Sequence, residues 1–194
     1  STKNLQDVNL TRAILVGVDL RGATLKKVTL ASSTLIRSDL SGAVVEESNL
    51  FNADLRGANL QNIRVASSSI MTSTNLRGAN LSGAILTKVD LRNAQLQDAD
   101  LTGAQLVEAD LRGANLEGAL MTGVNLTKAN LQGVNLSKTR DLRAANLTEA
   151  NLDDADLRKL DLTQAMLEKA KLTGAKLQEA NLSGANLTDR KSTR

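Results

Sequence analysis

The stretch Asn75–Gln132 decides the fold, because it divides every five residues into variants of one short phrase. Its pentads read NLRGA, NLSGA, ILTKV, DLRNA, QLQDA, DLTGA, QLVEA, DLRGA, NLEGA, LMTGV, NLTKA and NLQ. A unit this short cannot bury an apolar face by itself, so its copies must stack on one another. The stretch therefore predicts a solenoid.

The same phrase continues in both directions, with a large apolar residue at the centre of each pentad. The centres run from Leu5 to Ile70, from Leu76 to Leu136 and from Leu142 to Leu187. We place one extra residue at each of the two breaks, near Ser73 and near Thr139. We expect both to be corner bulges that the solenoid absorbs, and the alternative is a loop that interrupts one face to meet a partner.

The residues around each centre indicate which side chains point inward. A small residue stands two positions earlier, as Ala53 does before Leu55, and residues two apart in an extended chain point the same way. All 13 glycines lie two positions after a centre, where Asn or Asp is found in other pentads. Such a position favours φ > 0, as in a type II turn. Each pentad is therefore a short extended piece followed by a corner, and a period of five does not fit an α-helix.

The A-[D/N]-L-x-x pattern, as in 53–57 and 114–118, resembles the pentapeptide-repeat family from about Asn4 to about Asp189. The resemblance implies an all-β fold, a right-handed quadrilateral β-helix with four pentads in each coil and about nine coils in this chain. We treat 1–194 as a single solenoid domain. Because no terminal capping helix is apparent, we expect either end-to-end self-association or attachment to a larger chain.

The composition removes most catalytic chemistry. Phe51 is the single aromatic residue, and the chain has no Trp, Tyr, His, Cys or Pro. Without His or Cys, the commonest general base and the thiolate ligands are missing. We therefore expect no enzyme activity, no catalytic residue, no cofactor and no metal site.

Charge and hydropathy limit the partners and the location. The 24 basic and 21 acidic residues are interspersed, which argues against nucleic-acid binding. No apolar run approaches the roughly 20 residues that span a bilayer, and no signal-like apolar core opens the chain. We expect a cytoplasmic protein without a membrane span, and leave open an export signal that has been removed.

Acidic and basic residues recur two apart in six copies of Asp-Leu-Arg. We expect an exposed ion pair in each, contributing about 0–1 kcal/mol, and interpret the pairs as surface features. The six copies begin at Asp19, Asp54, Asp90, Asp110, Asp141 and Asp156.

Apolar outward positions are the first candidates for partner contact. Stepping by twenty residues, with allowance for the first break, stacks Phe51 under Met71 on one face. The same stepping places further apolar residues on the neighbouring face, namely Val44, Ile85 and Val107. A second small group near the start comprises Ile14, Val16 and Ile36. Contiguous apolar patches mark contact surfaces, whereas scattered apolar residues are ordinary.

The second break supplies basic candidates. Taken literally, the register would turn Arg140 inward as an unpaired charge. We expect the extra residue to turn Arg140 outward instead, where it would join Lys138 and Arg143 in a basic cluster.

These features favour a non-catalytic protein-protein interaction or scaffold module whose protein partner is unknown. The resemblance supports this, since most family members have no assigned activity and many occur in cyanobacteria.

The alternative is a DNA-mimicking protein that binds type II topoisomerases (gyrase) and protects them from quinolones. The family members that act in this way tend to have Phe at many centres, a strongly acidic surface and a dimerising C-terminal helix. This chain has no Phe at any centre and a net charge of +3, so we prefer the first reading.

Overall fold

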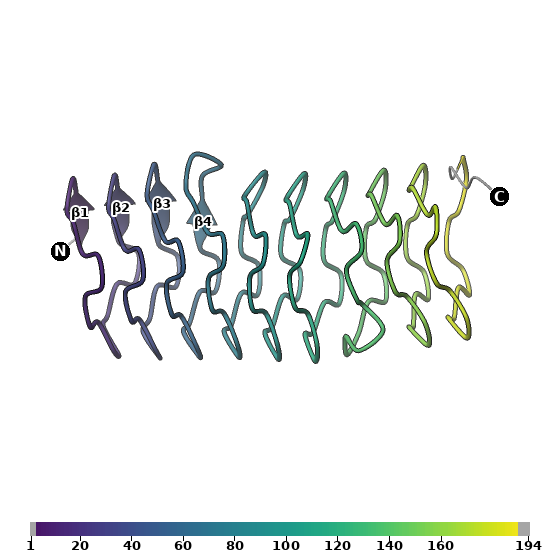
Figure 1. Ribbon diagram of the computed structural model, residues 1–194, viewed down its shortest axis with the longest axis horizontal. Helices are drawn as coiled ribbons and strands as arrows, with labels where there is room; N and C mark the ends of the chain where they lie inside the picture. The colour runs from purple at the N-terminus through teal and green to yellow at the C-terminus, as the bar shows by residue number, and fades with distance from the viewer. Residues whose placement is uncertain (1–2, 190–194) are drawn as a thin grey trace.

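A computed structural model describes residues 3–189 and shows a rod of stacked four-sided coils (Figure 1). One face near the N-terminus carries a parallel sheet in the order β1-β2-β3-β4. Its strands are β1 (Asn4–Gln6), β2 (Thr24–Lys26), β3 (Val44–Glu46) and β4 (Arg64–Val65). Elsewhere the coils are joined by isolated parallel bridges, such as Asn9 to Thr29 and Ile14 to Thr34. The expected all-β quadrilateral β-helix is confirmed, and residues 3–189 contain no helix.

We name the four faces after the centres of the first coil. On the Leu5 face, Leu5 pairs with Leu25 and Leu25 pairs with Val45, each at a step of twenty residues. The Leu10, Leu15 and Leu20 faces follow in chain order, and each ends in a corner that we call the edge of that face. Pentads thus recur on the same face once in every coil.

The first break lies earlier than the sequence suggested. Val45 pairs with Val65 at a step of 20, whereas Asn49 already pairs with Ile70 at a step of 21. The extra residue therefore lies between Val65 and Ile70, in a corner formed by 66–68, and not near Ser73. Ser69 then takes the small inward position, where it is buried.

This placement corrects the expected role of two apolar residues. Met71 is 1% exposed and is the buried centre of its pentad, whereas Ile70 is 44% exposed and points outward. The prediction that Ile70 is a centre and Met71 an outward contact is wrong. Both residues are apolar and follow a run of serines, so composition alone does not choose between the two registers.

The second extra residue is Arg140. Thr139 takes the half-buried small position, with its backbone N–H and its hydroxyl both donating to the Leu136 carbonyl, at 3.0 and 2.8 Å. Arg140 follows in a bend and is exposed, as expected. The pairing step rises to 21 beyond it, as between Leu120 and Asp141.

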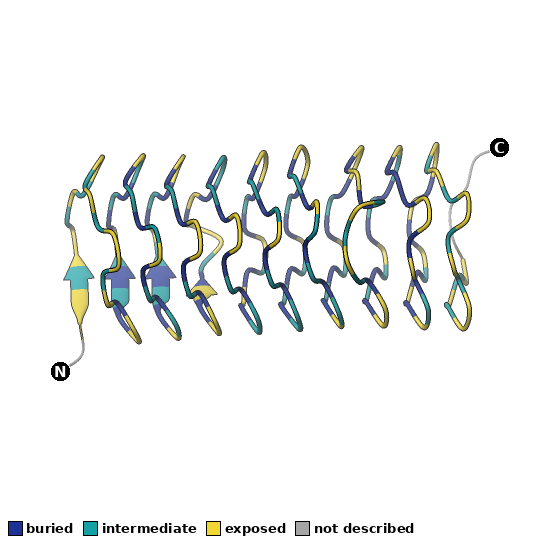
Figure 2. Cartoon of the chain, turned by 90° about the horizontal axis from the view of Figure 1, so that it is seen from below, coloured by how far each residue is buried: buried dark blue, intermediate teal, exposed yellow. Residues whose placement is uncertain are grey.

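The interior consists of stacked columns of centres and small residues (Figure 2). Between Leu20 and Leu172 all centres are buried, and almost all the small residues between them are too. Fully burying a leucine side chain contributes roughly 1.5–3 kcal/mol before entropy is counted. The first and last described coils cover their columns less completely, so Leu5 and Leu187 are half-buried.

The corners have the conformation that the glycines indicated. The Ala13 N–H donates to the Leu10 carbonyl at 3.0 Å and closes a turn in which Arg12 has φ 59°. Within residues 3–189, the second corner residue has φ > 0 at every pentad except at the two breaks. Lys, Glu and Arg occupy this position as well as Gly, Asn and Asp, although a residue with a Cβ atom is sterically disfavoured at positive φ.

Candidate interaction surfaces

The outward Asn and Asp residues complete the turns, which the sequence analysis did not anticipate. The Asn80 side-chain oxygen accepts a hydrogen bond from the Ser82 backbone N–H at 3.0 Å, and Asp19 accepts one from Arg21 at 3.1 Å. Each bond satisfies the first N–H of a corner, as Asx turns do. The signal was present in the sequence, because Asn and Asp dominate the position just before each centre.

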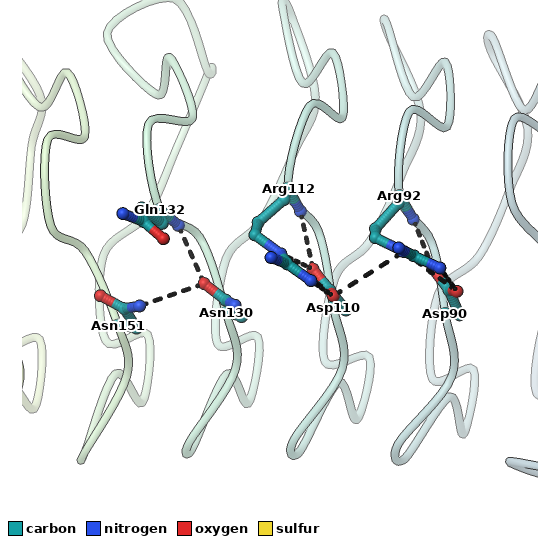
Figure 3. A network of polar contacts seen from close by, with 7 residues as sticks. All are labelled: Asp90, Arg92, Asp110, Arg112, Asn130, Gln132 and Asn151. Atoms are coloured by element: carbon teal, nitrogen blue, oxygen red, sulfur yellow. Dashed lines mark hydrogen bonds and ion pairs between the residues drawn. The ribbon is translucent and has the colours of Figure 1, made fainter.

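All six expected Asp-Leu-Arg ion pairs form, with N–O distances of 2.6–3.0 Å. Figure 3 shows two of them in adjacent coils, where Arg92 Nε also approaches Asp110 at 3.9 Å. The next coils continue the row with amides, and the Asn151 Nδ2 group donates to the Asn130 Oδ1 atom at 3.3 Å (Figure 3). The row therefore contains two separate groups of polar contacts, one of ion pairs and one of amides.

The ion pairs shift the titration of their carboxylates. Arg158 donates to both carboxylate oxygens of Asp156 and lowers the pKa of that side chain to about 2. Arg143 acts in the same way on Asp141, whose pKa is also lowered to about 2. These carboxylates are held in the charged form, which suits a structural role better than proton transfer.

The apolar candidates are only partly brought together. Phe51 is exposed on the Leu10 face, and its counterpart in the next coil is Thr72, because the Asn52 N–H donates to the Thr72 carbonyl. The exposed Ile70 pairs with Asn49, two residues before Phe51, so Phe51 and Ile70 lie diagonally on adjacent coils. Ile70 was missed because it had been assigned to the core. We call Phe51 and Ile70 the apolar pair.

On the Leu5 face the expected apolar group is interrupted. Arg64 pairs with Val44 on one side and with Ile85 on the other, so the two apolar residues lie two coils apart. Val44 and Val107 are half-buried, and Ile85 is 38% exposed. The same face carries a further exposed residue, Met166, which the sequence analysis did not single out.

The three basic candidates at the second break do not form a shared cluster of free charges. Lys138 Nζ contacts Glu117 at 3.0 Å, and Arg143 contacts Asp141 at 2.7 Å. Arg140 has no carboxylate within 4.0 Å among residues 3–189. Two of the three charges are therefore neutralised, Lys138 by a residue of the preceding coil and Arg143 by the aspartate of its own pentad.

Three hollows follow the edge of the Leu15 face, and the sequence did not predict them. Their volumes are about 710, 500 and 210 Å³. They are lined by residues of that face and its edge, from Ile36 and Arg37 at one end to Gln178 and Glu179 at the other. The hollows therefore form a row along one side of the rod.

Two further features are not found among the described residues. Within 3–189, no group of three or more Asp and Glu residues is arranged to hold a metal ion. The same part of the chain contains no helix with the length and apolarity needed to cross a membrane.

Comparisons with known proteins find several similar chains. The chain is similar to HetL, a pentapeptide repeat protein involved in heterocyst differentiation regulation from the cyanobacterium Nostoc sp. strain PCC 7120, with 33% identity over 94% of this chain and 84% of that one, at a TM-score of 0.38. It is also similar to a pentapeptide repeat protein of the Arabidopsis thaliana thylakoid lumen, with 32% identity over 54% of this chain and 68% of that one, at a TM-score of 0.39.

A third solved structure, a trypsin-treated form of QnrB1, a plasmid-mediated fluoroquinolone resistance protein, shares 20% identity over 100% of this chain and 91% of that one, at a TM-score of 0.48. A comparison with curated proteins finds no match.

The family model for pentapeptide repeats matches eight copies, over 4–42, 30–64, 71–103, 104–140, 141–174 and 165–189. These matches cover nearly the whole chain and leave out the first break. The chain therefore belongs to the pentapeptide-repeat family, whose members form right-handed quadrilateral β-helices.

Proposed function

We propose that this chain is a non-catalytic protein-interaction module, a rigid rod that presents rows of side chains to a protein partner. The proposal rests on how the coils are joined and on which apolar side chains are exposed at the surface.

Rigidity follows from the backbone hydrogen bonds between coils. Leu55 donates to the Asn75 carbonyl and Leu60 to the Asn80 carbonyl, both at 2.7 Å, and equivalent bonds recur on the other faces. A segment tied to its neighbours above and below has few independent motions. The rod can therefore hold contact residues at a fixed spacing of about 4.8 Å per coil.

The observation that carries the proposal is the apolar pair. Phe51 and Ile70 are 47% and 44% exposed, in adjacent coils of a face whose other outward residues are mostly polar. The corner formed by 66–68 is separated from Ile70 by Ser69 alone, so the first break lies close to the pair. Exposed aromatic and aliphatic side chains that lie together are typical anchors of protein interfaces.

Site-specific photocrosslinking tests the proposal in cells that produce the protein. Benzoylphenylalanine is placed at Phe51 or at Ile70, and at Gln132 as a matched outward position on the same face. The proposal predicts one discrete adduct from the first two positions and none from Gln132. The adduct from position 51 should be lost when I70S is added, and the adduct from position 70 should be lost when F51S is added. The absence of an adduct, or the same adduct from all three positions, would contradict it.

The mixed surface charge favours this function over DNA mimicry. The net charge is +3, and each acidic member of the Asp-Leu-Arg pairs is neutralised by an arginine. A DNA mimic instead needs a continuous negative surface, because DNA carries one charge per roughly 1.7 Å. Inhibition of gyrase supercoiling by low micromolar protein would reverse this preference.

A further inference from the structure

The hollow of about 500 Å³ on the Leu15 edge gathers basic side chains from three successive coils. Arg37, Arg56 and Arg77 line it together with Ile36, two glycines and Asp98. We call this the arginine hollow. Like charges on successive coils repel one another, so their grouping needs an explanation.

Another edge of the same rod shows how the fold otherwise arranges corner charges. On the Leu5 edge, Lys and Glu alternate from coil to coil and pair across them. The pairs are Lys27 with Glu47 at 4.0 Å, Lys88 with Glu108 at 3.4 Å, and Lys128 with Glu149 at 3.8 Å. The arginine hollow lacks this alternation, although the backbone geometry is equivalent.

The arginines are unequally neutralised by the chain itself. Arg56 is held by Asp54 at 2.7 Å, whereas Arg77 only approaches Asp98 at 3.9 Å. Arg37 has no carboxylate within 4.0 Å among residues 3–189. The hollow thus retains positive charge that an external anion could neutralise.

Glycines open the floor of the hollow. Arg37 Cγ would lie 3.7 Å from a Cβ added at Gly57, so the Arg37 side chain extends over that glycine toward the next coil. Gly78 has open space at the same position one coil further. Side chains at these corners would fill the hollow.

An apolar surface adjoins the basic one. The Gly17 N–H donates to the Ile36 carbonyl at 2.9 Å, which stacks the corner of Val16 on that of Ile36. Val16 is 57% exposed, and Ile36 lines the hollow. From Val16 to Arg77 the edge spans three coil steps of about 4.8 Å, or roughly 15 Å, which matches about five residues of extended chain.

We propose that this edge binds an extended acidic polypeptide segment, with an apolar residue on Val16 and Ile36 and carboxylates in the arginine hollow. The proposal rests on the proposed function and adds the chemistry of the partner. Arginine recognises carboxylates through paired hydrogen bonds, which suits an acidic segment.

The acidic residues at the far end of the hollow and beyond it favour a polypeptide over nucleic acid. Asp98 lines the last coil of the arginine hollow, and Glu117 follows along the same edge, before the second basic hollow that contains Lys138 and Arg158. A continuous polyanion laid along the edge would meet these carboxylates. A short peptide with mixed composition need not extend that far.

Fluorescence anisotropy with a defined probe tests the proposal on the full chain. The probe is a dye-labelled peptide of two leucines followed by four glutamates interspersed with glycine, and the controls are its lysine counterpart and an oligothymidine of similar length. The R37E/R77E variant is compared with R64E, which reverses an exposed charge on the Leu5 face. Glu47 and Glu108 already occupy corners with φ > 0, so R37E is compatible with the fold.

We expect the acidic peptide to bind the wild-type chain, the lysine counterpart not to bind, and R37E/R77E to weaken binding about tenfold while R64E leaves it unchanged. Higher salt should also weaken the binding of the acidic peptide to the wild-type chain. Equal losses in both variants, no binding of the acidic peptide, or tighter binding of the oligothymidine would overturn the proposal. If the crosslinker at position 51 gives an adduct that I70S abolishes while the acidic peptide does not bind, the interaction function stands and this inference fails.

Discussion

The Asp98 carboxylate lies over Gly118 in the next coil, in the space that a Cβ atom on residue 118 would need. The same relationship recurs between Asn93 and Gly113 and between Asp154 and Gly174. Gly123 differs, because a Cβ added there would meet open space although its φ is also positive, at 63°. Comparing these two kinds of corner distinguishes the energetic cost of a side chain at positive φ from the cost of displacing a side chain of the neighbouring coil.

Replacing these glycines by alanine should therefore have unequal effects. G123A bears only the cost of a side chain at positive φ, about 1 kcal/mol. G118A also displaces Asp98, and we expect it to lower the free energy of unfolding by about 1–2 kcal/mol more than G123A. Urea denaturation measures both. The added D98A substitution should remove the difference, and equal losses in G118A and G123A would show that the contact is unimportant.

The Asp156–Arg158 pair predicts a specific dependence of stability on pH. The folded-state pKa of Asp156 is lowered to about 2, chiefly by the hydrogen bonds from Arg158, whereas an unfolded Asp titrates near 3.9. A lowered folded pKa stabilises the native state above about pH 4, and this contribution disappears as the pH falls toward 2. The free energy lost in D156N should therefore be largest near neutral pH and shrink between pH 4 and 2.

Removing the arginine supplies the control for that prediction. R158M keeps the carboxylate but not its hydrogen-bond donor, so stability should lose part of its dependence on pH in the same interval. Chemical denaturation at a series of pH values distinguishes the variants. A D156N difference that stays constant from pH 6 to pH 2 would mean that the ion pair does not set the pKa.

The corner formed by 66–68 should tolerate shortening. It contains one residue more than the regular corners, which close through a bond such as Ala13 N–H to Leu10 C=O. Deleting Ser67 restores the regular length, and we expect the deletion variant to unfold at the same temperature as the wild type or higher. A deletion within a regular corner, such as that of Gly103, is the control and should destabilise strongly because it misplaces every centre on one side. Calorimetry compares the two.

The interior could be predicted from the sequence because period, inward spacing and turn residues agree in nearly every pentad. The first break could not be placed, because Ser67, Ser68 and Ser69 are equivalent in composition and Ile70 and Met71 are both apolar. The position of the break is decided by the inter-coil pairing of Asn49 with Ile70, which joins residues 21 positions apart.

The candidate surfaces were predicted less well, since they depend on side chains from successive coils. Glu117 reaches across a coil to neutralise Lys138, and Arg64 separates Val44 from Ile85. The arginine hollow joins residues about twenty and forty positions apart, and its depth depends on the glycines between them. Stepping by a fixed period locates such columns but does not say which charges pair.

The assignment of inward and outward positions across the first break underlies both the fold and the apolar pair. Thermal unfolding of I70N and M71N tests it most directly. The two positions are adjacent, and each substitution replaces an apolar side chain by the same amide. We predict that I70N unfolds within a few degrees of the wild type, whereas M71N, which places an amide in the dry column, is strongly destabilised or fails to fold. A folded M71N alongside a destabilised I70N would contradict the register and the apolar pair together.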